Sequence, residues 1–552
     1  MAIRSDASEA APDRSGSVLT WWQQGVIYQI YPLSFQDTDS DGCGDLPGIL
    51  RRLEYLSWLG VDAVWLSPIY PSPMEDFGYD ISDYTNVHPL FGTLDDLDRL
   101  TAELHARKIR LILDFVPNHT SSAHPWFLDS CSARTNPKRD WYIWCDPAPD
   151  GGPPNNWLSR FGDNAWELDG RTGQYYYHAF LKTQPDLNWR NPEVRRAMAD
   201  ILRFWMRRGI DGFRIDAAAV LAEDALLRDD PPNPDFCKDT PPPERFQRVY
   251  TDNRPECLRY LAELHAVTDK FPDRVLLGEV DTAEDQVAQF YGCDQRCLDL
   301  PLNYRLLDTS WDAASLRAVI GSYLDALPPH ASPCWVIGSH DKPRIASRIG
   351  AAQARLAAML LLTLPGTPIL YAGDEIGMGD VPIPPDQALD PFEHRVPGYG
   401  LNRDPERAPM CWDNGPAAGF TSGDPWLPVG DNVERCTVAT LRRDEHSLLT
   451  LYRRLIAYRR TEPAILGRCW EPEPGHGDVL AYWRCVGSRR IFVALNLGGQ
   501  DEELVLACAG EVSLSTHLDR PTEGVKGNVR LRPHEGIIIA DQTGRYLGAD
   551  CT

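Results

Sequence analysis

The spacing of hydrophobic positions alternates regularly between a strand-like and a helix-like pattern along most of the chain. From about residue 26, apolar runs of strand length alternate with stretches whose apolar residues recur every three or four positions, as in a helix. Because these strands are apolar almost throughout, both faces should be covered, as in a parallel sheet. The predicted strands start near residues 26, 62, 110, 211, 274, 297, 333 and 368. Eight strand–helix units predict an α/β fold, a (β/α)8 TIM barrel with long insertions.

Two regions depart from this pattern. Residues 120–189 are rich in Trp, Pro, Asn, Gly and Asp and too long for an ordinary loop, so they predict a subdomain inserted after the third strand. Beyond residue 465 the runs become short and alternating, which predicts a C-terminal antiparallel β-sandwich over 465–552. The barrel then comprises 21–119 and 190–464. Residues 1–20 lack the apolar segment of a secretory signal and are interpreted as a disordered leader.

Composition narrows the range of partners. The 552 residues carry a net charge of −24, which disfavours nucleic acid and anionic membrane surfaces as partners and favours a small neutral ligand. No run of 18 apolar residues occurs, so no membrane span is predicted. The 14 cysteines form no CxxC pair, which favours reduced thiols in the cytoplasm over a zinc site or a disulfide framework. We expect a monomer or a homodimer and no organic cofactor.

Polar side chains follow several of the predicted strands, at the end where TIM barrels carry their active sites. They are Asp114, Asn118 and His119 after the third strand, Arg214 and Asp216 at the fourth, Glu279 at the fifth, and His340 and Asp341 at the seventh. Arg214 and Asp216 are two positions apart in a strand, so their side chains should point the same way. A purely structural charge network would also fit this pattern.

The motifs that contain these residues resemble a known family. DFVPNH, GFRID, LLGEV and GSHD resemble, in this order, the four signature regions of the α-amylase superfamily, glycoside hydrolase family 13. QPDLNW (184–189) resembles the inserted-domain motif of its oligo-1,6-glucosidase and α-glucosidase branch, and GVDAVWLSPIYPSP, DFGYDISDY and GTPILYAGDEIGM also match in kind and order. The resemblance covers roughly residues 21–545.

The resemblance implies three catalytic carboxyl groups. Asp216 matches the nucleophile, Glu279 the acid/base, and Asp341 the residue that holds sugar hydroxyls and stabilises the transition state. A retaining glycosidase needs its nucleophile and its acid/base about 5–5.5 Å apart. Arg214 should keep Asp216 ionised, because a nearby cation lowers the pKa of a carboxyl group. Glu279, in contrast, must carry a proton before the attack.

Further residues are implied to contact the substrate. By resemblance they are Asp80 and Arg407 on the terminal glucose, Tyr79 stacked on its ring, and His119 and His340 as hydrogen-bond donors. The structural alternatives are packing for Tyr79, satisfied structural histidines, and a surface ion pair for Arg407. Ala217, directly after the nucleophile, correlates in the family with α-1,4 or broader use rather than with α-1,6 preference. The family motif has glutamine where this chain has Cys411.

These matches predict a retaining, exo-acting α-glucosidase that releases glucose from the non-reducing end of short α-glucosides. Maltose-type sugars are the expected substrates, with sucrose or isomaltose as further candidates. The alternative is a transglucosylase or a sugar isomerase, of the sucrose isomerase or trehalose synthase type, that uses the same glycosyl-enzyme. A non-enzyme, like the amino-acid transporter heavy chains of this fold, is disfavoured because those chains carry a transmembrane helix and lack catalytic acids.

An acidic loop follows the first strand. In DTDSDGCGD (37–45) the carboxylates alternate, and their hard oxygen atoms suit Ca²⁺. The expected ligands of a structural Ca²⁺ are Asp37, Asp39, Asp41, Asp45 and the Cys43 backbone carbonyl. Similar loops hold Ca²⁺ in α-glucosidases of this type, although an acidic turn without a metal would also fit.

Overall fold

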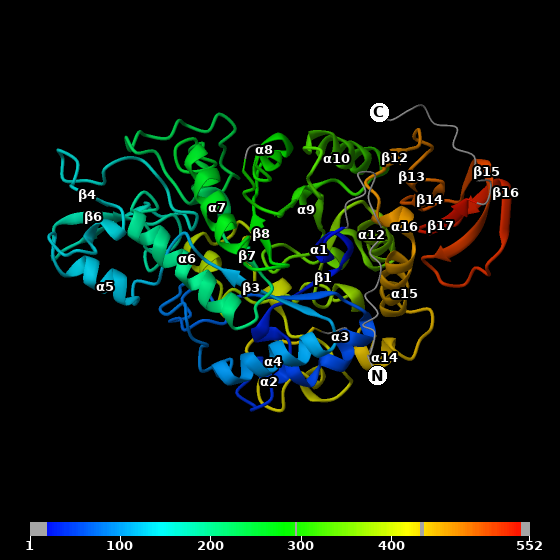
Figure 1. The fold of residues 1–552 in the computed structure, drawn as a ribbon, viewed down its shortest axis with the longest axis horizontal. Coiled ribbons are helices and arrows are strands. Elements are labelled where there is room, and N and C mark those ends of the chain that lie inside the picture. The colour runs from blue at the N-terminus through cyan, green and yellow to red at the C-terminus, as the bar shows by residue number, and fades with distance from the viewer. Residues whose placement is uncertain (1–18, 293–294, 431–434, 542–552) are drawn as a thin grey trace, which may run out of the picture.

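The computed structural model describes residues 19–292, 295–430 and 435–541. The leader expected over residues 1–20 lies outside the described residues except for its last two positions. Figure 1 shows a central barrel, with the inserted segment on one side and the C-terminal sheet on the other.

Eight parallel strands form the barrel, as predicted. They are β1 (Ile27–Ile30), β2 (Ala63–Leu66), β3 (Arg110–Phe115), β7 (Gly212–Ile215), β8 (Val275–Glu279), β9 (Leu300–Leu302), β10 (Cys334–Val336) and β11 (Thr367–Tyr371). Each begins within three residues of its predicted start. Seven of the eight contacts are regular parallel pairings, in the order β10-β11-β1-β2-β3-β7-β8-β9. A parallel bridge between Asn303 and Trp335 closes the ring from β9 to β10.

The barrel interior is filled by apolar side chains at its N-terminal end and becomes polar at the other. Trp65, Val275 and Leu277 belong to one buried cluster, which Trp22 of α1 (Trp21–Gln24) joins from below. On β7 the inward-facing positions are Gly212 and Arg214, and Asp216 follows the strand. The guanidinium of Arg214 lies 5.2 Å from the ring centroid of Trp65, at the boundary between the two regions.

Helices cover the outside of the barrel. The longer ones are α4 (Leu94–Ala106), α6 (Pro192–Arg207), α7 (Pro255–Thr268), α10 (Ala313–Ala326), α12 (Ala351–Thr363) and α15 (Leu448–Thr461). The shorter ones are α2 (Leu46–Arg51), α3 (Leu53–Leu59), α8 (Glu284–Gln289), α9 (Arg305–Asp308), α11 (Ile345–Ile349), α13 (Pro391–Arg395), α14 (Val438–Leu441) and α16 (Pro463–Leu466). In α6 the Asn191 side chain accepts the Glu193 N–H as N-cap, and Val194, Met198 and Trp205 form the buried stripe. Among the described residues, no helix is both long and apolar enough to cross a membrane.

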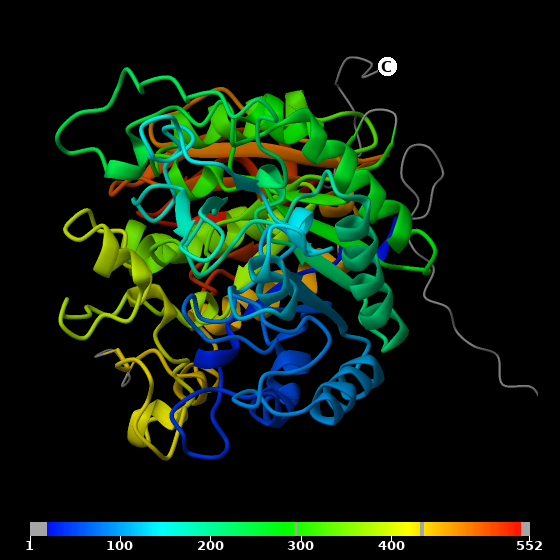
Figure 2. The same ribbon diagram turned by 90° about the vertical axis from the view of Figure 1, so that its left-hand side faces the viewer.

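The inserted segment has its own small sheet. After α5 (Pro125–Ser132), the strands β4 (Trp144–Cys145), β5 (Trp166–Asp169) and β6 (Gln174–Tyr177) form an antiparallel sheet in the order β4-β6-β5. Figure 2 views the molecule from this side and shows the segment in front of the barrel. A bridge between His119 and Asp186 joins the two ends of the insertion at the barrel rim, so its side chains reach the site there.

The C-terminal region forms one antiparallel sheet of six strands. These are β12 (Glu471–Pro472), β13 (Val479–Val486), β14 (Arg489–Asn496), β15 (Glu502–Ser515), β16 (Gly524–Leu531) and β17 (Gly536–Asp541). On one face, Leu480 and Tyr482 join the main core. On the other face, a second buried cluster draws on all five long strands, so the sheet curls and covers its own outer face. The sequence predicted the antiparallel strands, and the structure joins them in one curled sheet.

Candidate active site

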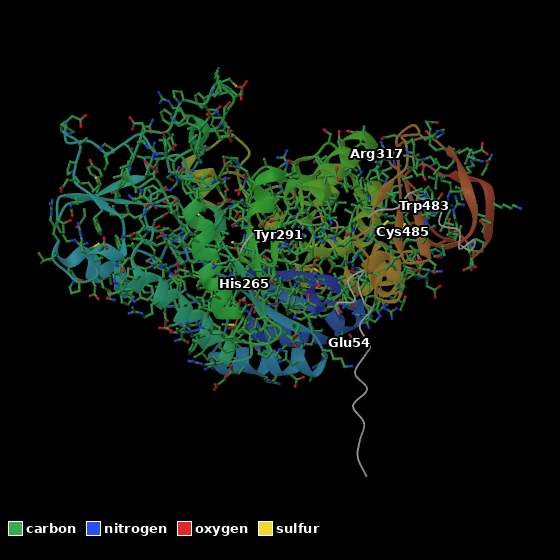
Figure 3. All side chains as sticks on the ribbon, turned by 45° about the horizontal axis from the view of Figure 1, so that its top comes forward. Glu54, His265, Tyr291, Arg317, Trp483 and Cys485 are labelled. Atoms are coloured by element: carbon green, nitrogen blue, oxygen red, sulfur yellow. The ribbon has the colours of Figure 1, made fainter. Side chains whose placement is uncertain are left out.

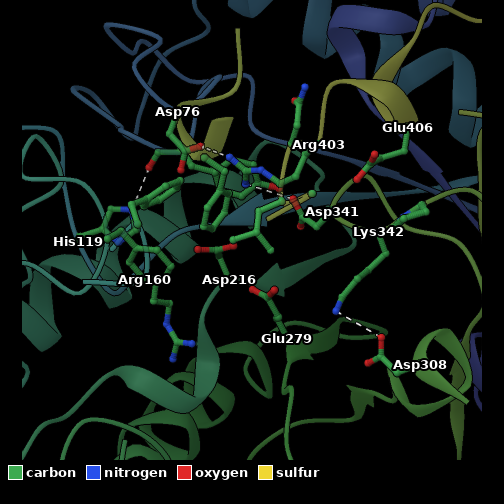
Figure 4. Close-up of a pocket in the computed structure, with 18 residues that line it drawn as sticks. Asp76, His119, Arg160, Asp216, Glu279, Asp308, Asp341, Lys342, Arg403 and Glu406 are labelled. Carbon is green, nitrogen blue, oxygen red and sulfur yellow. Dashed lines mark hydrogen bonds and ion pairs between the residues drawn. The ribbon is translucent and has the colours of Figure 1, made fainter. Parts of the chain in front are cut away.

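A cavity of about 490 Å³ opens at the C-terminal ends of the barrel strands. Tyr79, His119, Asp216, Glu279 and Asp341 all line it, as the sequence predicted. Figure 4 shows Asp216 and Glu279 near the middle of the cavity, with Asp76 and His119 beyond Asp216 and with Lys342 and Asp308 on the other side of Glu279.

Arg214 holds the carboxyl groups of this cavity together. Its Nη1 donates to Asp216 Oδ1 at 2.6 Å and to Asp114 Oδ1 at 3.0 Å, and its Nη2 forms an ion pair with Glu279 Oε2 at 3.0 Å. Arg214 has no exposed surface. Two carboxyl groups that contact one guanidinium from adjacent strands β7 and β8 lie close together and face the same space.

The charges around Arg214 do not balance, because one cation faces three carboxyl groups. Burial raises the pKa of Asp114 to about 6 and that of Asp216 well above its usual value. Arg214 lowers the pKa of Asp216, as expected, but burial and repulsion from Glu279 and Asp114 outweigh it. The free site therefore takes up a proton more readily than the sequence analysis expected, and the ionised fraction of Asp216 depends on pH.

Asp341 has the opposite electrostatic environment. Its carboxylate contacts His340 Nε2 at 3.2 Å, Arg403 Nη1 at 3.3 Å and Arg407 Nη2 at 2.8 Å. Burial alone would raise the pKa of Asp341, but these three groups hold it below its usual value. Asp341 is therefore an ionised carboxylate, suited to accept hydroxyl hydrogen bonds and to stabilise positive charge.

Asp80 does not reach the cavity, contrary to the sequence expectation. It is fully buried, and its carboxylate accepts the Ser72 hydroxyl at 2.7 Å and two backbone N–H groups, those of Glu75 and Asp76. These bonds fix the turn before Tyr79. Asp76, three residues before Tyr79, lines the cavity instead.

Asp76 is held by groups from two distant segments. Arg403 Nη2 donates to Asp76 Oδ1 at 2.9 Å, and Gln184 Nε2 donates to Asp76 Oδ2 at 3.1 Å. Gln184 belongs to the QPDLNW motif of the insertion and is fully buried. The ion pair and the amide together hold Asp76 in the cavity wall.

Arg407 is also placed differently from the expectation. It is buried and does not line the cavity; its Nε donates to the His340 carbonyl at 2.8 Å, and its Nη2 holds Asp341. Arg403 lies with Arg407 in the stretch NRDPERAPMCW (402–412); it lines the cavity and pairs with Asp76, Asp341 and Asp390. The motif thus supplies one arginine to the cavity and one to the support of Asp341. Cys411 of this motif is buried and does not line the cavity.

Both predicted histidines are buried and act as neutral groups. Burial lowers the pKa of His119 and His340 to about 4 and about 3. His119 lies beside Phe180, with ring centroids 5.0 Å apart. Tyr79 stacks on His340 with ring centroids 5.7 Å apart, and its hydroxyl donates to Asp114 Oδ2 at 3.1 Å. Tyr79 therefore connects the Asp114 side of the cavity with the His340 and Asp341 side.

Ala217 contributes its backbone to the site. It has a left-handed conformation, with φ 49° and ψ 39°, at the start of a 3₁₀ turn over Ala218–Val220. Its N–H donates to Glu279 Oε2 at 2.9 Å. Ala217 therefore positions Glu279, and its side chain is not among the groups that line the cavity.

Several lining residues were missed by sequence reasoning. They are Asp76, Arg160, Phe161, Phe180, Asp308, Lys342, Phe392, Arg403 and Glu406. Lys342 and Asp308 form an ion pair of 3.5 Å, in which Asp308 is the last residue of α9 and its side chain is exposed. The aromatic residues Phe161 and Phe180 come from the insertion. Most of these side chains lie on loops, where no hydrophobic period marks them. Arg403 and Glu406 lie within the motif for which the family resemblance pointed to Arg407.

The acidic loop brings together part of the expected metal-ligand set. Carboxylate oxygens of Asp37, Asp39 and Asp45 lie within 4.8 Å of one another, whereas Asp41 is not in this group. Asp37 also accepts the N–H groups of Asp39, Ser40 and Gly42. Asp45 caps α2 by accepting the Gly48 N–H at 2.6 Å. The Thr421 hydroxyl also donates to Asp37 Oδ2, so all four lone pairs of Asp37 accept hydrogen bonds. The lone pairs that remain for a cation belong to Asp39 and to Asp45 Oδ1.

Comparison with known proteins gives consistent matches over nearly the whole chain. The family model "Alpha amylase, catalytic domain" matches residues 29–467. A probable α-glucosidase of Rhizobium meliloti (strain 1021) is 39% identical over 503 residues, which is 89% of this chain and 90% of the relative. An oligo-1,6-glucosidase of Halalkalibacterium halodurans is 36% identical and covers 96% of this chain and 99% of its own.

Solved structures agree in fold. An α-glucosyl transfer enzyme, XgtA, matches with a TM-score of 0.90 at 38% identity and covers 95% of this chain and 100% of its own. An isomaltulose synthase from Klebsiella sp. LX3 matches with a TM-score of 0.86 at 32% identity, with the same coverage of both chains.

Glu406 provides a test of the electrostatics of the cavity wall. Burial raises its pKa to about 8, above its usual 4.5, so the folded protein holds one extra proton between these values. Stability should therefore fall as pH rises from about 4.5 to about 8. The Glu406→Gln variant should lack this part of the pH-dependent decrease in the free energy of unfolding, which is on the order of 2–4 kcal/mol.

The measurement is thermal unfolding between pH 5 and pH 8.5. The exposed change Glu445→Gln serves as the control and should keep the wild-type pH profile. An identical pH slope in wild type and Glu406→Gln would contradict the assigned environment of Glu406.

Proposed function

Because the chain belongs to the α-amylase family, glycoside hydrolase family 13, we propose that it is a retaining, exo-acting α-glucosidase. It releases glucose from the non-reducing end of short α-glucosides. One observation carries the proposal: Asp216 and Glu279, from adjacent strands, face one cavity and contact the same guanidinium. Retaining glycosidases require such a close pair of carboxyl groups.

In the first step Asp216 attacks the anomeric carbon. Glu279 gives its proton to the leaving oxygen, the glycosidic bond breaks, and a covalent glycosyl-enzyme forms. Asp341, held ionised by Arg403 and Arg407, stabilises the positive charge that develops on the sugar ring. In the second step the Glu279 carboxylate takes a proton from water, which attacks and releases glucose with the α-configuration.

The inner end of the cavity supports exo action. Asp76, Arg403 and Gln184 are joined by hydrogen bonds at that end and are at most partly exposed, so a chain has no room to continue past the terminal glucose. Asp76 and Arg403 present polar groups suited to its far hydroxyls. This role takes the place of the one expected for Asp80 and Arg407.

Maltose-type α-1,4 substrates are the proposed preference. Ala217 leads to this proposal through the family correlation, and the short cavity suits a disaccharide. Transfer of glucose to a sugar acceptor, or isomerisation of a disaccharide, is the second candidate function. It is favoured by the likeness to a glucosyl transfer enzyme and to an isomaltulose synthase, since both would use the same intermediate.

A structural Ca²⁺ in the loop 37–45 is a further part of the proposal. Asp37, Asp39 and Asp45 would hold it, and Asp41 and the Cys43 carbonyl are additional candidate ligands. Bound there, the ion would add positive charge among these acids and fix the loop against the barrel. We further propose a cytoplasmic protein, monomeric or homodimeric, with mostly reduced thiols, which is supported by the absence of a CxxC pair from the sequence.

Asp216→Asn and Glu279→Gln test the assignment of the catalytic pair. Each should lower glucose release from p-nitrophenyl α-glucoside by a factor of about 10³ or more, because the nucleophile or the proton donor is lost. The exposed variant Glu54→Gln, far from the cavity, should keep wild-type turnover. Near-normal turnover of either active-site variant would refute the proposal.

The product mixture separates hydrolysis from transfer. With maltose, isomaltose and sucrose at high concentration, a hydrolase yields mainly glucose, measured by chromatography of the reaction products. Disaccharide isomers or longer oligosaccharides as the main products would instead establish the second candidate function. Optical rotation during the first minutes should show α-glucose as the initial product.

Removal of the cation tests the metal site. A chelator should lower the thermal midpoint, and added Ca²⁺ should restore it, because the ion binds the folded state. Asp39→Asn should weaken this response more than Asp41→Asn, since Asp41 lies outside the converging group. An unchanged midpoint with chelator would exclude the structural ion.

A further inference from the structure

A second reactive cluster lies in the C-terminal sheet, away from the cavity. The sulfur atoms of Cys469 and Cys485 and a carboxylate oxygen of Glu471 lie within 4.8 Å of one another. Cys485 is on β13, and Cys469 lies two residues before β12. Figure 3 shows the position of Cys485 near Trp483 in this sheet.

The strand register brings the two cysteines opposite each other. Glu471 pairs with Trp483 and Pro472 with Tyr482, so two residues further along Cys469 faces Cys485. Opposite residues of an antiparallel pair have Cβ atoms about 4.5–5.5 Å apart, close to the spacing of a disulfide. Arg484 Nε donates to the Cys469 carbonyl at 2.6 Å and holds this segment against β13.

The two thiols differ in their surroundings. The hydrogen bond from Cys469 and the nearby Arg490 lower the pKa of Cys485 to about 7 although burial opposes this shift. The single proton of the Cys469 thiol is shared between two acceptors, the Cys485 sulfur and Glu471 Oε1 at 3.5 Å, and the pKa of Cys469 is raised, first by the hydrogen bond with Cys485. Cys485 is therefore the nucleophilic thiolate, and Cys469 is the neighbouring thiol that can react with it.

A cation already occupies the side where a metal ion would bind. Arg490 forms an ion pair of 3.3 Å with Glu471 and lies 4.3 Å from the ring centroid of Trp483. Its positive charge beside Glu471 and Cys485 disfavours a metal held by the three groups. Covalent sulfur chemistry is therefore the better account of this cluster.

We propose that Cys469 and Cys485 form a reversible disulfide when the protein meets hydrogen peroxide. The Cys485 thiolate attacks a peroxide oxygen and the O–O bond breaks, which gives a sulfenic acid. The departing hydroxide takes up the proton that the Cys485 thiol had released and leaves as water. The sulfur of Cys469 then attacks the Cys485 sulfur, and the S–O bond breaks. The hydroxyl leaves with the Cys469 proton as a second water. Two thiols lose two electrons, and one peroxide is reduced to two waters.

The full-length reduced protein, treated with hydrogen peroxide, provides the test. Remaining thiols are blocked by alkylation, and the digest is analysed by mass spectrometry. The expected result is a peptide pair joined through Cys469 and Cys485, lighter than the free peptides by two hydrogen atoms and separated by a reductant. The thermal midpoint of the oxidised protein should rise and return on reduction.

Variants distinguish this pair from general oxidation. Cys485→Ser should lose the linked peptide and the shift of the midpoint. Cys469→Ser should leave a sulfenic acid at Cys485 that a dione probe traps. Cys237→Ser removes an exposed cysteine outside the cluster and should behave as wild type.

Two results would overturn the proposal. One is a digest in which peroxide leaves Cys469 and Cys485 alkylated as fully as in the untreated protein. The other is stoichiometric zinc in the purified protein that protects both thiols from alkylation. Neither result depends on the glucosidase assignment, because the cluster lies in the C-terminal sheet.

Discussion

The structure depends on one buried guanidinium that holds three carboxyl groups inside a barrel. Arg214 could not stay there alone, since a buried charge needs partners, and Asp114, Asp216 and Glu279 could not approach one another without it. The apolar layer below, with Trp65 and Val275, excludes water from the lower side of this group. The same low-polarity surroundings that make the cluster costly also make each charge strong toward a reacting sugar.

A second group of charges determines the shape of the cavity. Arg403 and Arg407 belong to one short motif, but their side chains point in different directions. Arg403 points into the cavity, and Arg407 lies behind Asp341. Gln184 brings the insertion into contact with Asp76, so the subdomain and the barrel meet at a hydrogen bond on the substrate side. The family resemblance of the insertion motif therefore has a physical basis, because its amide positions an acid that lines the cavity.

The strands could be predicted because they follow a period, and the acids that line the cavity could be predicted because they follow strands at a known edge of the barrel. Asp80 could not be distinguished from Asp76 in this way, since both lie in one turn and only the folded turn shows which carboxylate is turned inward. Arg407 ends the 3₁₀ turn Pro405–Arg407 and Arg403 lies two residues before that turn, and sequence gives no direction for either side chain. The pKa of Asp216 was misjudged because its pair with Arg214 is local, whereas burial and Asp114 are contributions of the whole fold.

The closed inner end of the cavity has a consequence for the order of events. In a cavity with one opening, the first product, the aglycone, leaves through the same entrance by which the second reactant, water or a sugar, arrives. The acceptor of the bound glucose is the molecule that occupies this entrance when the aglycone leaves, either water or another sugar. Lys342 and Asp308 lie at this rim. The passage of water or of a sugar past them, rather than the catalytic acids, would then determine whether the bound glucose is hydrolysed or transferred.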